Sequence, residues 1–320
     1  MKQIILDFPK QFEAGIKAAR NIEIAGPFSD IVICGVGGSA LPGSLLPELG
    51  MKFDLPLFVH RDYGLPKAAS GKSLILCISF SGNTEETLSA YQEAIEKNYK
   101  TVAICTGGKL KETAEQNSLP LAIVPNDCLQ PRFGTGYLVG AVLKILNNCG
   151  IISDQDKNLS EMAQALRPEE SEQSGKELAQ KLINKIPVIY ASGKHKSLAR
   201  IWKIKFNENS KIMAFWNYFP ELNHNEMVGL TDLKGDFHFI VLRDADDYEK
   251  TKKRMDLFAG LAKEKGAGVD FVEISGKNTL EKTFNALLLG DWTSYYLAAA
   301  YSRDPVPVSI VEEFKKRLVK

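Results

Sequence analysis

The sequence has little that would direct the protein to a membrane or to nucleic acid. It carries 40 Lys and Arg against 39 Asp and Glu, and the resulting charge of +1 gives no overall field that favours nucleic acid or an anionic membrane. The two longest apolar stretches are interrupted by Lys144 and Asp291, so neither predicts a membrane-spanning helix. The N-terminal residues lack the apolar core and cleavage site of a signal peptide. We therefore expect a cytoplasmic protein with no membrane or nucleic-acid partner.

Cysteine is also scarce. The five cysteines (Cys34, Cys77, Cys105, Cys128 and Cys149) are odd in number and scattered, and none forms a CxxC pair. Three of them lie in or beside apolar, strand-like runs, where cysteine usually serves as a small hydrophobic residue. We therefore expect reduced thiols and no zinc or other metal site.

What the sequence does have is a regular alternation of short apolar runs and helical patterns. Hydrophobic residues make up 44% and charged residues 25% of the 320 positions, which is ordinary globular composition and enough for two domains. Such alternation predicts a parallel sheet covered by helices on both faces, with ligands bound at the carboxyl ends of the strands. The strand-like runs of the first half are residues 31–34, 57–60, 74–78, 101–105 and 121–124.

The second half repeats this plan. Residues 187–193 match residues 31–38 in position, and residues 237–244 match the run that begins at residue 74. This internal repeat predicts an α/β chain of two tandem, doubly wound, flavodoxin-like domains with parallel sheets. We place the boundary in a polar stretch, which gives domains of residues 1–153 and 154–320.

One loop in the first half has the composition of a phosphate site. The apolar run of residues 74–78 is followed by Ser79-Phe80-Ser81-Gly82-Asn83-Thr84 and then by a helix-favouring segment. Unpaired N–H groups at a helix start attract phosphate, and the hydroxyls of Ser79, Ser81 and Thr84 add donors without adding charge. An ordinary capping turn is the alternative, because Ser and Thr are common N-caps.

The corresponding loops of the second half have lost this composition. Ser192-Gly193-Lys194-His195 and Arg243-Asp244-Ala245-Asp246 stand where the first half has glycine and hydroxyl residues. Lys194-His195-Lys196 could form a remnant site or a solvated turn; we expect the solvated turn, and a structural role for His195.

Two further segments suit proton transfer. Glu208 lies between Asn207 and Asn209, and His224 lies between Asn223 and Asn225. Amides can orient a carboxylate or an imidazole without adding charge. The aromatic segment of residues 215–219 would keep the site dry and raise the pKa of Glu208. In the alternative interpretation Glu208 is a surface carboxylate at a helix end and His224 is a packed loop histidine.

Together these blocks resemble the sugar isomerase (SIS) domain family, and within it the bifunctional phosphoglucose/phosphomannose isomerases, which consist of two tandem SIS domains. The resemblance covers nearly the whole chain. The serine-rich loop marks any SIS protein, whereas Asn207-Glu208-Asn209 and residues 220–226 are specific to this isomerase group.

The resemblance implies an aldose–ketose isomerase without a cofactor, acting as a homodimer. It would interconvert glucose 6-phosphate, and mannose 6-phosphate as a second substrate, with fructose 6-phosphate through a cis-enediolate. Its phosphate site would comprise Gly38, Ser39, Ser79, Ser81 and Thr84.

The resemblance also implies the catalytic roles. Glu208 would carry the proton between C1 and C2, and His224 would open and close the pyranose ring, reaching into the partner subunit's site. Arg132 and the backbone N–H of Gly38 would stabilise the enediolate, whose charge needs a fixed cation or dipole.

A family lysine near the C-terminus that helps ring opening would be Lys315 or Lys316, although a solvated basic helix end is the alternative. No clear counterpart of the family's threonine linked with mannose 6-phosphate is present in residues 304–309. Phosphoglucose activity is therefore the firmer expectation.

Two other functions fit parts of the sequence. Gly35-x-Gly37-x-x-Ala40 after a strand matches a dinucleotide fingerprint, but Asp62 is late for the acidic residue that binds a ribose. A non-enzymatic sugar-phosphate sensor would use the same SIS domains, but no DNA-binding appendage with a basic face is visible. Neither alternative explains Glu208.

Overall fold

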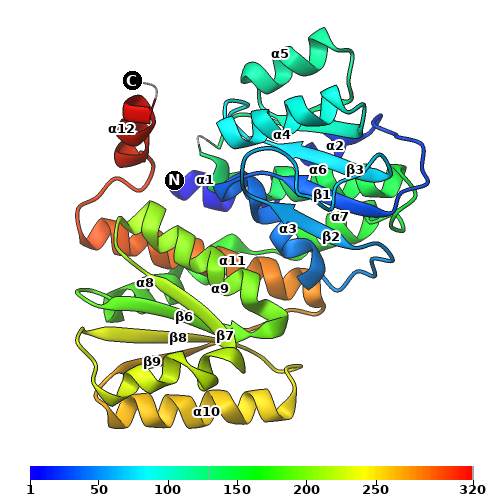
Figure 1. Cartoon of the computed structure of the whole chain (residues 1–320). Helices are drawn as coiled ribbons and strands as arrows, with labels where there is room; N and C mark the ends of the chain where they lie inside the picture. The colour runs from blue at the N-terminus through cyan, green and yellow to red at the C-terminus, as the bar shows by residue number, and fades with distance from the viewer. Residues whose placement is uncertain (129, 319–320) are drawn as a thin grey trace. The chain divides into compact units, whose positions relative to one another are not determined.

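The computed structural model describes residues 1–128 and 130–318, and it consists of two compact units (Figure 1). Leu6–Leu166 form one, called here the N-terminal unit. Met1–Ile5 together with Arg167–Lys320 form the other, the C-terminal unit. The division falls after Leu166 rather than after residue 153, because helix α7 (Asp156–Ala165) packs on helix α2 (Lys10–Ala19).

The N-terminal unit is built on a five-stranded sheet in the order β2-β1-β3-β4-β5, and every neighbouring pair is parallel. This is the flavodoxin-like order, in which the chain reverses direction across the sheet at β1 and β3. The expected fold is therefore confirmed for this unit. The strands are β1 (Asp30–Cys34), β2 (Leu57–His60), β3 (Ser73–Ile78), β4 (Lys100–Cys105) and β5 (Leu121–Ile123).

The central strands of this sheet are buried on both faces. Every residue of β1 and β3 is buried, which explains why both read as continuous apolar runs rather than as alternating ones. Cys34 on β1, Cys77 on β3 and Cys105 at the end of β4 are buried free thiols, packed against α4 and α5. The remaining helices of the unit are α3 (Leu41–Leu45), α4 (Glu85–Glu96), α5 (Gly108–Gln116) and α6 (Thr135–Asn148).

The C-terminal unit repeats the strand order with one strand fewer. Its four parallel strands run in the order β7-β6-β8-β9, which confirms the tandem arrangement of two doubly wound sheets. The first edge strand, β7, is the aromatic segment whose strand character the sequence pattern did not reveal. The strands are β6 (Ile186–Ser192), β7 (Phe215–Phe219), β8 (Phe237–Asp244) and β9 (Gly268–Ile274).

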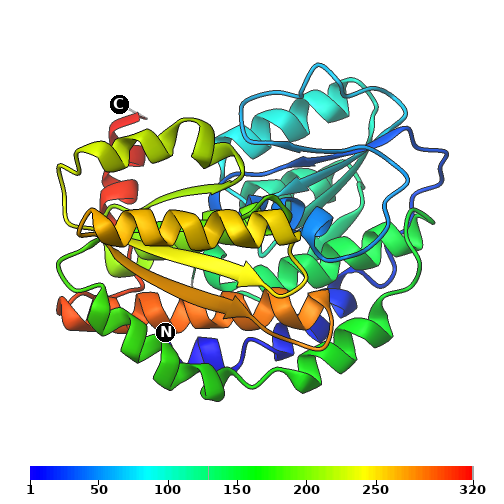
Figure 2. The same ribbon diagram turned by 90° about the horizontal axis from the view of Figure 1, so that it is seen from below.

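Helices cover both faces of this second sheet, and Figure 2 shows α10 and α11 on opposite sides of β8 and β9. Beneath α10 lies an aromatic core in which Tyr190, Phe219 and Phe239 all contact Phe258. Helix α11 has 22 residues, yet none of the helices in the described residues offers an apolar stretch that could cross a bilayer. The helices are α8 (Glu172–Lys181), α9 (Lys196–Lys205), α10 (Glu249–Glu264), α11 (Thr279–Ala300) and α12 (Ser309–Leu318).

The loop after β3 depends on a glycine, and this can be tested with a matched pair of variants. Gly82 and Gly150 both have φ of +70°, but a Cβ on Gly82 would lie 1.7 Å from the carbonyl oxygen of Gly107, whereas Gly150 has open space. We expect Gly150→Ala to cost about 1 kcal/mol for the backbone conformation alone, and Gly82→Ala about 2–4 kcal/mol because two backbones collide. Urea unfolding of both variants measures the difference, and equal losses would contradict the close approach.

Candidate active site

The serine-rich loop of the N-terminal unit forms a closed turn at the carboxyl end of β3. Ser79 Oγ donates to Thr84 Oγ1 at 2.9 Å and accepts the N–H of Thr84 at 3.3 Å. Ser81 is exposed, and its Oγ accepts the N–H of Asn83 at 3.2 Å. Helix α4 begins directly after Thr84, so the loop does lead into a helix N-terminus. Ser79 and Thr84 thus shape the loop through their hydroxyl groups, and Ser81 presents its own outward.

The loop after β1 joins the same edge of the sheet. It forms a short 3-10 turn, η1 (Gly37–Ala40), and Ser39 Oγ accepts the N–H of Phe80 at 2.9 Å. This bond links the β1 loop to the β3 loop across two neighbouring strands. The structure therefore brings Ser39, Ser79, Ser81 and Thr84 together, as the sequence pattern predicted.

Gly38 and Arg132 also lie together. A Cβ on Gly38 would stand 2.7 Å from the backbone nitrogen of Arg132, so only glycine permits this approach. Arg132 belongs to a second 3-10 turn, η3 (Pro131–Phe133), and is 1% exposed, with its guanidinium over the ring of Phe133. A buried arginine beside backbone N–H groups suits the stabilisation of an oxyanion.

In the C-terminal unit, Glu208 lies in a turn of π-helix. Helix α9 ends at Lys205 and continues as η6 (Phe206–Ser210), whose wider turn ends at Lys211 with φ of +61°. Single π-helical turns often occur at functional sites, because the extra residue displaces the side chains of that turn from the regular helical positions. Glu208 itself is half-buried.

The amides beside Glu208 support the turn that carries it. Asn207 Nδ2 donates to the carbonyl of Ile212 at 2.8 Å, and Asn209 Nδ2 donates to Ser294 Oγ at 2.9 Å. Asn209 is fully buried. These bonds fix where the π-helical turn sits against α11, and so fix the position of Glu208 indirectly.

A buried ion pair supports the same turn. Lys205 Nζ lies 2.5 Å from Asp291 Oδ1, and both side chains are less than a tenth exposed. Asp291 is the charge that interrupts the apolar sequence of α11. Its place is now explained by its partner, because an isolated buried charge would be strongly destabilising.

His224 lies on the segment that follows β7. This segment forms two 3-10 turns, η7 (Glu221–His224) and η8 (Glu226–Thr231), and His224 is exposed. Its neighbouring amides again bind elsewhere. Asn225 Nδ2 donates to Glu221 Oε1 at 2.7 Å, and Asn223 Nδ2 donates to Met227 Sδ at 3.6 Å.

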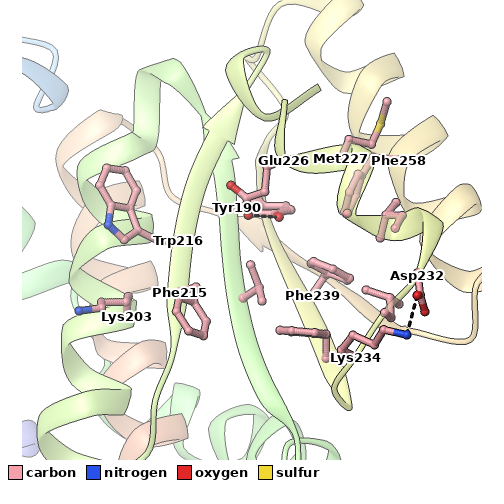
Figure 3. Close-up of a pocket in the computed structure, with 15 residues that line it drawn as sticks. Tyr190, Lys203, Phe215, Trp216, Glu226, Met227, Asp232, Lys234, Phe239 and Phe258 are labelled. Carbon is pink, nitrogen blue, oxygen red and sulfur yellow. Dashed lines mark hydrogen bonds and ion pairs between the residues drawn. The ribbon is translucent and has the colours of Figure 1, made fainter. Parts of the chain in front are cut away.

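The anchor of the His224 segment is Glu226, to which the sequence analysis gave no role. Its Oε1 accepts a hydrogen bond from the hydroxyl of Tyr190 at 2.5 Å (Figure 3). Its Oε2 accepts one from Asn217 Nδ2. Burial and the bond to Glu226 raise the pKa of Tyr190, so its hydroxyl remains a donor. Glu226 therefore ties the segment to both β6 and β7, two residues beyond His224.

Glu208 and His224 lie at opposite ends of the strands of the C-terminal sheet, one at the amino ends and the other at the carboxyl ends. Because β6 and β7 are parallel, α9 returns the chain to the amino end of β7, and Glu208 precedes this end. His224 follows the carboxyl end of the same strand. The five residues of β7 alone separate the two ends by about 13 Å. Within one C-terminal unit, the segments that carry the two side chains therefore lie at opposite ends of β7.

Lys315 lies on α12, where it forms an exposed ion pair with Glu312 at 3.2 Å. No residue of α12 is buried, and the large apolar side chains of Ile310 and Phe314 are exposed. This placement matches the alternative of a solvated basic helix end.

A cavity of the C-terminal unit has mostly apolar walls and is not lined by these groups. It has a volume of about 700 Å³ and lies beside β7 beneath η8, with Phe215, Phe237 and Met227 in its wall (Figure 3). Neither Glu208 nor His224 lines it. Its polar margin includes Glu226, which is already engaged by Tyr190.

Comparisons with known proteins place the chain in one family. The family described as "Bacterial phospho-glucose isomerase C-terminal SIS domain" matches residues 171–318. A bifunctional phosphoglucose/phosphomannose isomerase of Caldicellulosiruptor bescii is 38% identical over 99% of this chain and 98% of its own. That of Aquifex aeolicus is 35% identical over 92% of each chain.

A solved structure supports the fold. The C-terminal domain of glucosamine-fructose-6-phosphate aminotransferase from Francisella tularensis superposes with a TM-score of 0.72 and 17% identity, over 95% of this chain and 96% of that one. The full-length sequence match and the shared architecture agree. This chain belongs to the family of bifunctional phosphoglucose/phosphomannose isomerases.

Proposed function

We propose that this chain interconverts glucose 6-phosphate and mannose 6-phosphate with fructose 6-phosphate. The observation that carries the proposal is its near full-length relationship to curated bifunctional phosphoglucose/phosphomannose isomerases. One site serves both aldoses, because they differ only in configuration at C2 and the enediolate has no stereocentre there. Membership of this family favours an isomerase over a dinucleotide enzyme or a sugar-phosphate sensor.

The phosphate group binds at the edge of the N-terminal sheet. Ser81 offers an exposed hydroxyl, and α4 directs its first backbone N–H groups to the same loop. Ser39, Ser79 and Thr84 hold the two loops in place through the bonds described above. Because these donors are uncharged hydroxyl and amide groups, the site binds a dianion without a fixed cation and can release the product readily.

The proton transfer uses Glu208. In its half-buried turn it removes the proton at C2 of the aldose and returns it to C1, while the negative charge develops on the former carbonyl oxygen. Arg132 and the N–H of Gly38 stabilise that oxygen. The rigid support of Asn209 and of the Lys205–Asp291 pair fixes the position of Glu208, which proton transfer requires.

His224 opens the pyranose ring in the site of a second copy of the chain. This assignment is supported by the positions of Glu208 and His224, which precede and follow β7 and so lie at opposite ends of that strand. A closed two-fold dimer would supply two such mixed sites. Lys315 and Lys316 remain candidates for assisting ring opening once α12 has a partner.

The base can be tested by an isosteric change. We expect Glu208→Gln to lower kcat about 10³-fold on both aldose phosphates, since the amide cannot accept the proton, and to leave KM within a few-fold. Coupled assays of both substrates measure kcat, and binding of 6-phosphogluconate checks the site. Glu249→Gln, at an exposed position in the first turn of α10, serves as the control. Wild-type turnover of Glu208→Gln would exclude this residue as the base.

The origin of His224 can be tested by mixing subunits. Glu208→Gln and His224→Asn are each expected to be inactive. Refolded together in equal amounts they should regain about one quarter of wild-type activity, because half of the dimers are mixed and each mixed dimer holds one intact site. No regain would show that Glu208 and His224 act within one chain.

The anchor of the His224 segment can be tested through Glu226. Glu226→Gln replaces one acceptor oxygen by a donor, so it cannot accept from both Tyr190 and Asn217. We expect kcat to fall about 10–100-fold through misplacement of His224, with KM unchanged because the phosphate loops are intact. Tyr190→Phe removes only one of the two hydrogen bonds, so its kcat should lie between that of Glu226→Gln and that of the wild type. A change confined to KM would argue against a positioning role.

A further inference from the structure

The C-terminal unit has its own pair of loops at the carboxyl edge of its sheet. The 3-10 turn η5 (Gly193–His195) follows β6 as η1 follows β1, and Asp244 ends β8 where Ser79 follows β3. In both sheets the two strands concerned are direct neighbours. The place that holds hydroxyl groups in the N-terminal unit therefore has a counterpart in the C-terminal unit.

That counterpart is a buried carboxylate surrounded by donors. Asp244 Oδ1 accepts from Lys282 Nζ at 2.6 Å and from the N–H of Asp246 at 3.1 Å. Its Oδ2 accepts from Lys194 Nζ at 2.7 Å and from His195 Nε2 at 2.9 Å. Four donors occupy the four lone-pair positions of one carboxylate.

The burial of this cluster and the pKa shifts of its members indicate that the donors stabilise a negative charge. His195 and Asp244 are both fully buried, so the expected solvated turn is wrong for His195. Burial alone would raise the pKa of Asp244, but the bonds from Lys194, Lys282 and His195 outweigh it and hold that pKa well below its usual range. Burial lowers the pKa of His195, so its neutral ring donates through Nε2. Its buried Nδ1 makes no hydrogen bond within the described residues.

We propose that this edge is a second oxyanion site, of the kind that would take a carboxylate or phosphate, which the chain fills with its own Asp244. The two lysines come from separate elements, η5 and α11, and converge on one point that requires a negative charge. Since that charge is covalently attached, the C-terminal unit binds no sugar phosphate there. The chain accordingly keeps one phosphate site, in its N-terminal unit.

Two other carboxylates lie beside this cluster and limit the strength of the site. Asp246 Oδ2 lies 2.6 Å from Lys282 Nζ with its side chain 72% exposed, and Asp247 Oδ2 accepts the N–H of Asp244 at 3.0 Å. Their negative charge would weaken the binding of an external anion that replaced the Asp244 carboxylate.

The test removes the internal carboxylate and supplies one from solution. Asp244→Gly leaves a space with the shape of acetate, and we expect its thermal midpoint to lie below that of the wild type. Sodium acetate or sodium phosphate at about 50 mM should then raise the midpoint by about 2–4 °C relative to sodium chloride of equal ionic strength. The wild type should show no such difference. If Asp244→Gly folds poorly in chloride, its refolding yield in acetate gives the same comparison.

Two variants separate charge from shape. Asp244→Asn keeps the volume but loses the charge, so it should be destabilised and should not respond to acetate. Asp246→Gly removes an exposed partner of Lys282 and should change little. An Asp244→Gly protein indifferent to acetate and phosphate, or an Asp244→Asn protein as stable as the wild type, would overturn the proposal. Because these experiments measure stability, their outcome for the proposal does not depend on the isomerase activity.

Discussion

The strand order of a parallel sheet determines where this protein can place polar groups. All strands of each sheet run in the same direction, so their carboxyl ends and the loops that follow gather at one edge. Sequence positions as distant as Ser39 and Phe80 thereby become hydrogen-bonded neighbours, as do His195 and Asp244. Each helix returns the chain to the opposite edge. A group that follows a helix, such as Glu208, therefore lies near the amino ends of the strands, whereas a group that follows a strand lies near their carboxyl ends.

That constraint explains why Glu208 and His224 are supported by different parts of the structure on either side of β7. The π-helical turn with Glu208 precedes the strand and is fixed by contacts with α11, whereas His224 follows it and is fixed by Glu226 against β6 and β7. Each group has a separate support of buried or bonded polar side chains. Rigid support at both ends of one short strand suits two groups that serve different sites, and it is consistent with a catalytic arrangement shared between two copies.

The sequence was sufficient for the fold because buried parallel strands leave a plain signal. Runs such as residues 74–78 are apolar throughout, and the repeat of such runs predicted both sheets. Strand β7 was missed because it is an edge strand with exposed Phe215 and aromatic residues on both sides, so its pattern has neither alternation nor uniform burial. The boundary near residue 166 falls within the polar stretch that the sequence indicated, but its position there was not predicted, since α7 is polar along most of its surface and only its contact with α2 assigns it to the N-terminal unit.

For the candidate site, the sequence identified the loops but not the bonds within them. The hydroxyl residues were recognisable from composition, yet which of them would shape the loop and which would face outward depends on the turn itself. Partners distant in sequence, such as Asn209 with Ser294 or Lys205 with Asp291, could not be paired without the fold. Asp291 showed only as an interruption in an apolar helix, which is the weak signal that a buried charge leaves when its partner is unknown.

The two sheet edges show how one scaffold can hold an anion in two ways. In the N-terminal unit, hydroxyl groups gather at the sheet edge where we propose that a phosphate binds, and uncharged donors suit a ligand that must also leave. In the C-terminal unit, two ammonium groups and a buried imidazole surround a carboxylate that never leaves. Cations that must stay buried need a permanent counter-charge, because their desolvation is otherwise uncompensated. A duplicated domain that exchanges hydroxyl groups for lysines therefore gains a structural ion-pair cluster and gives up the exchange of ligand that catalysis needs.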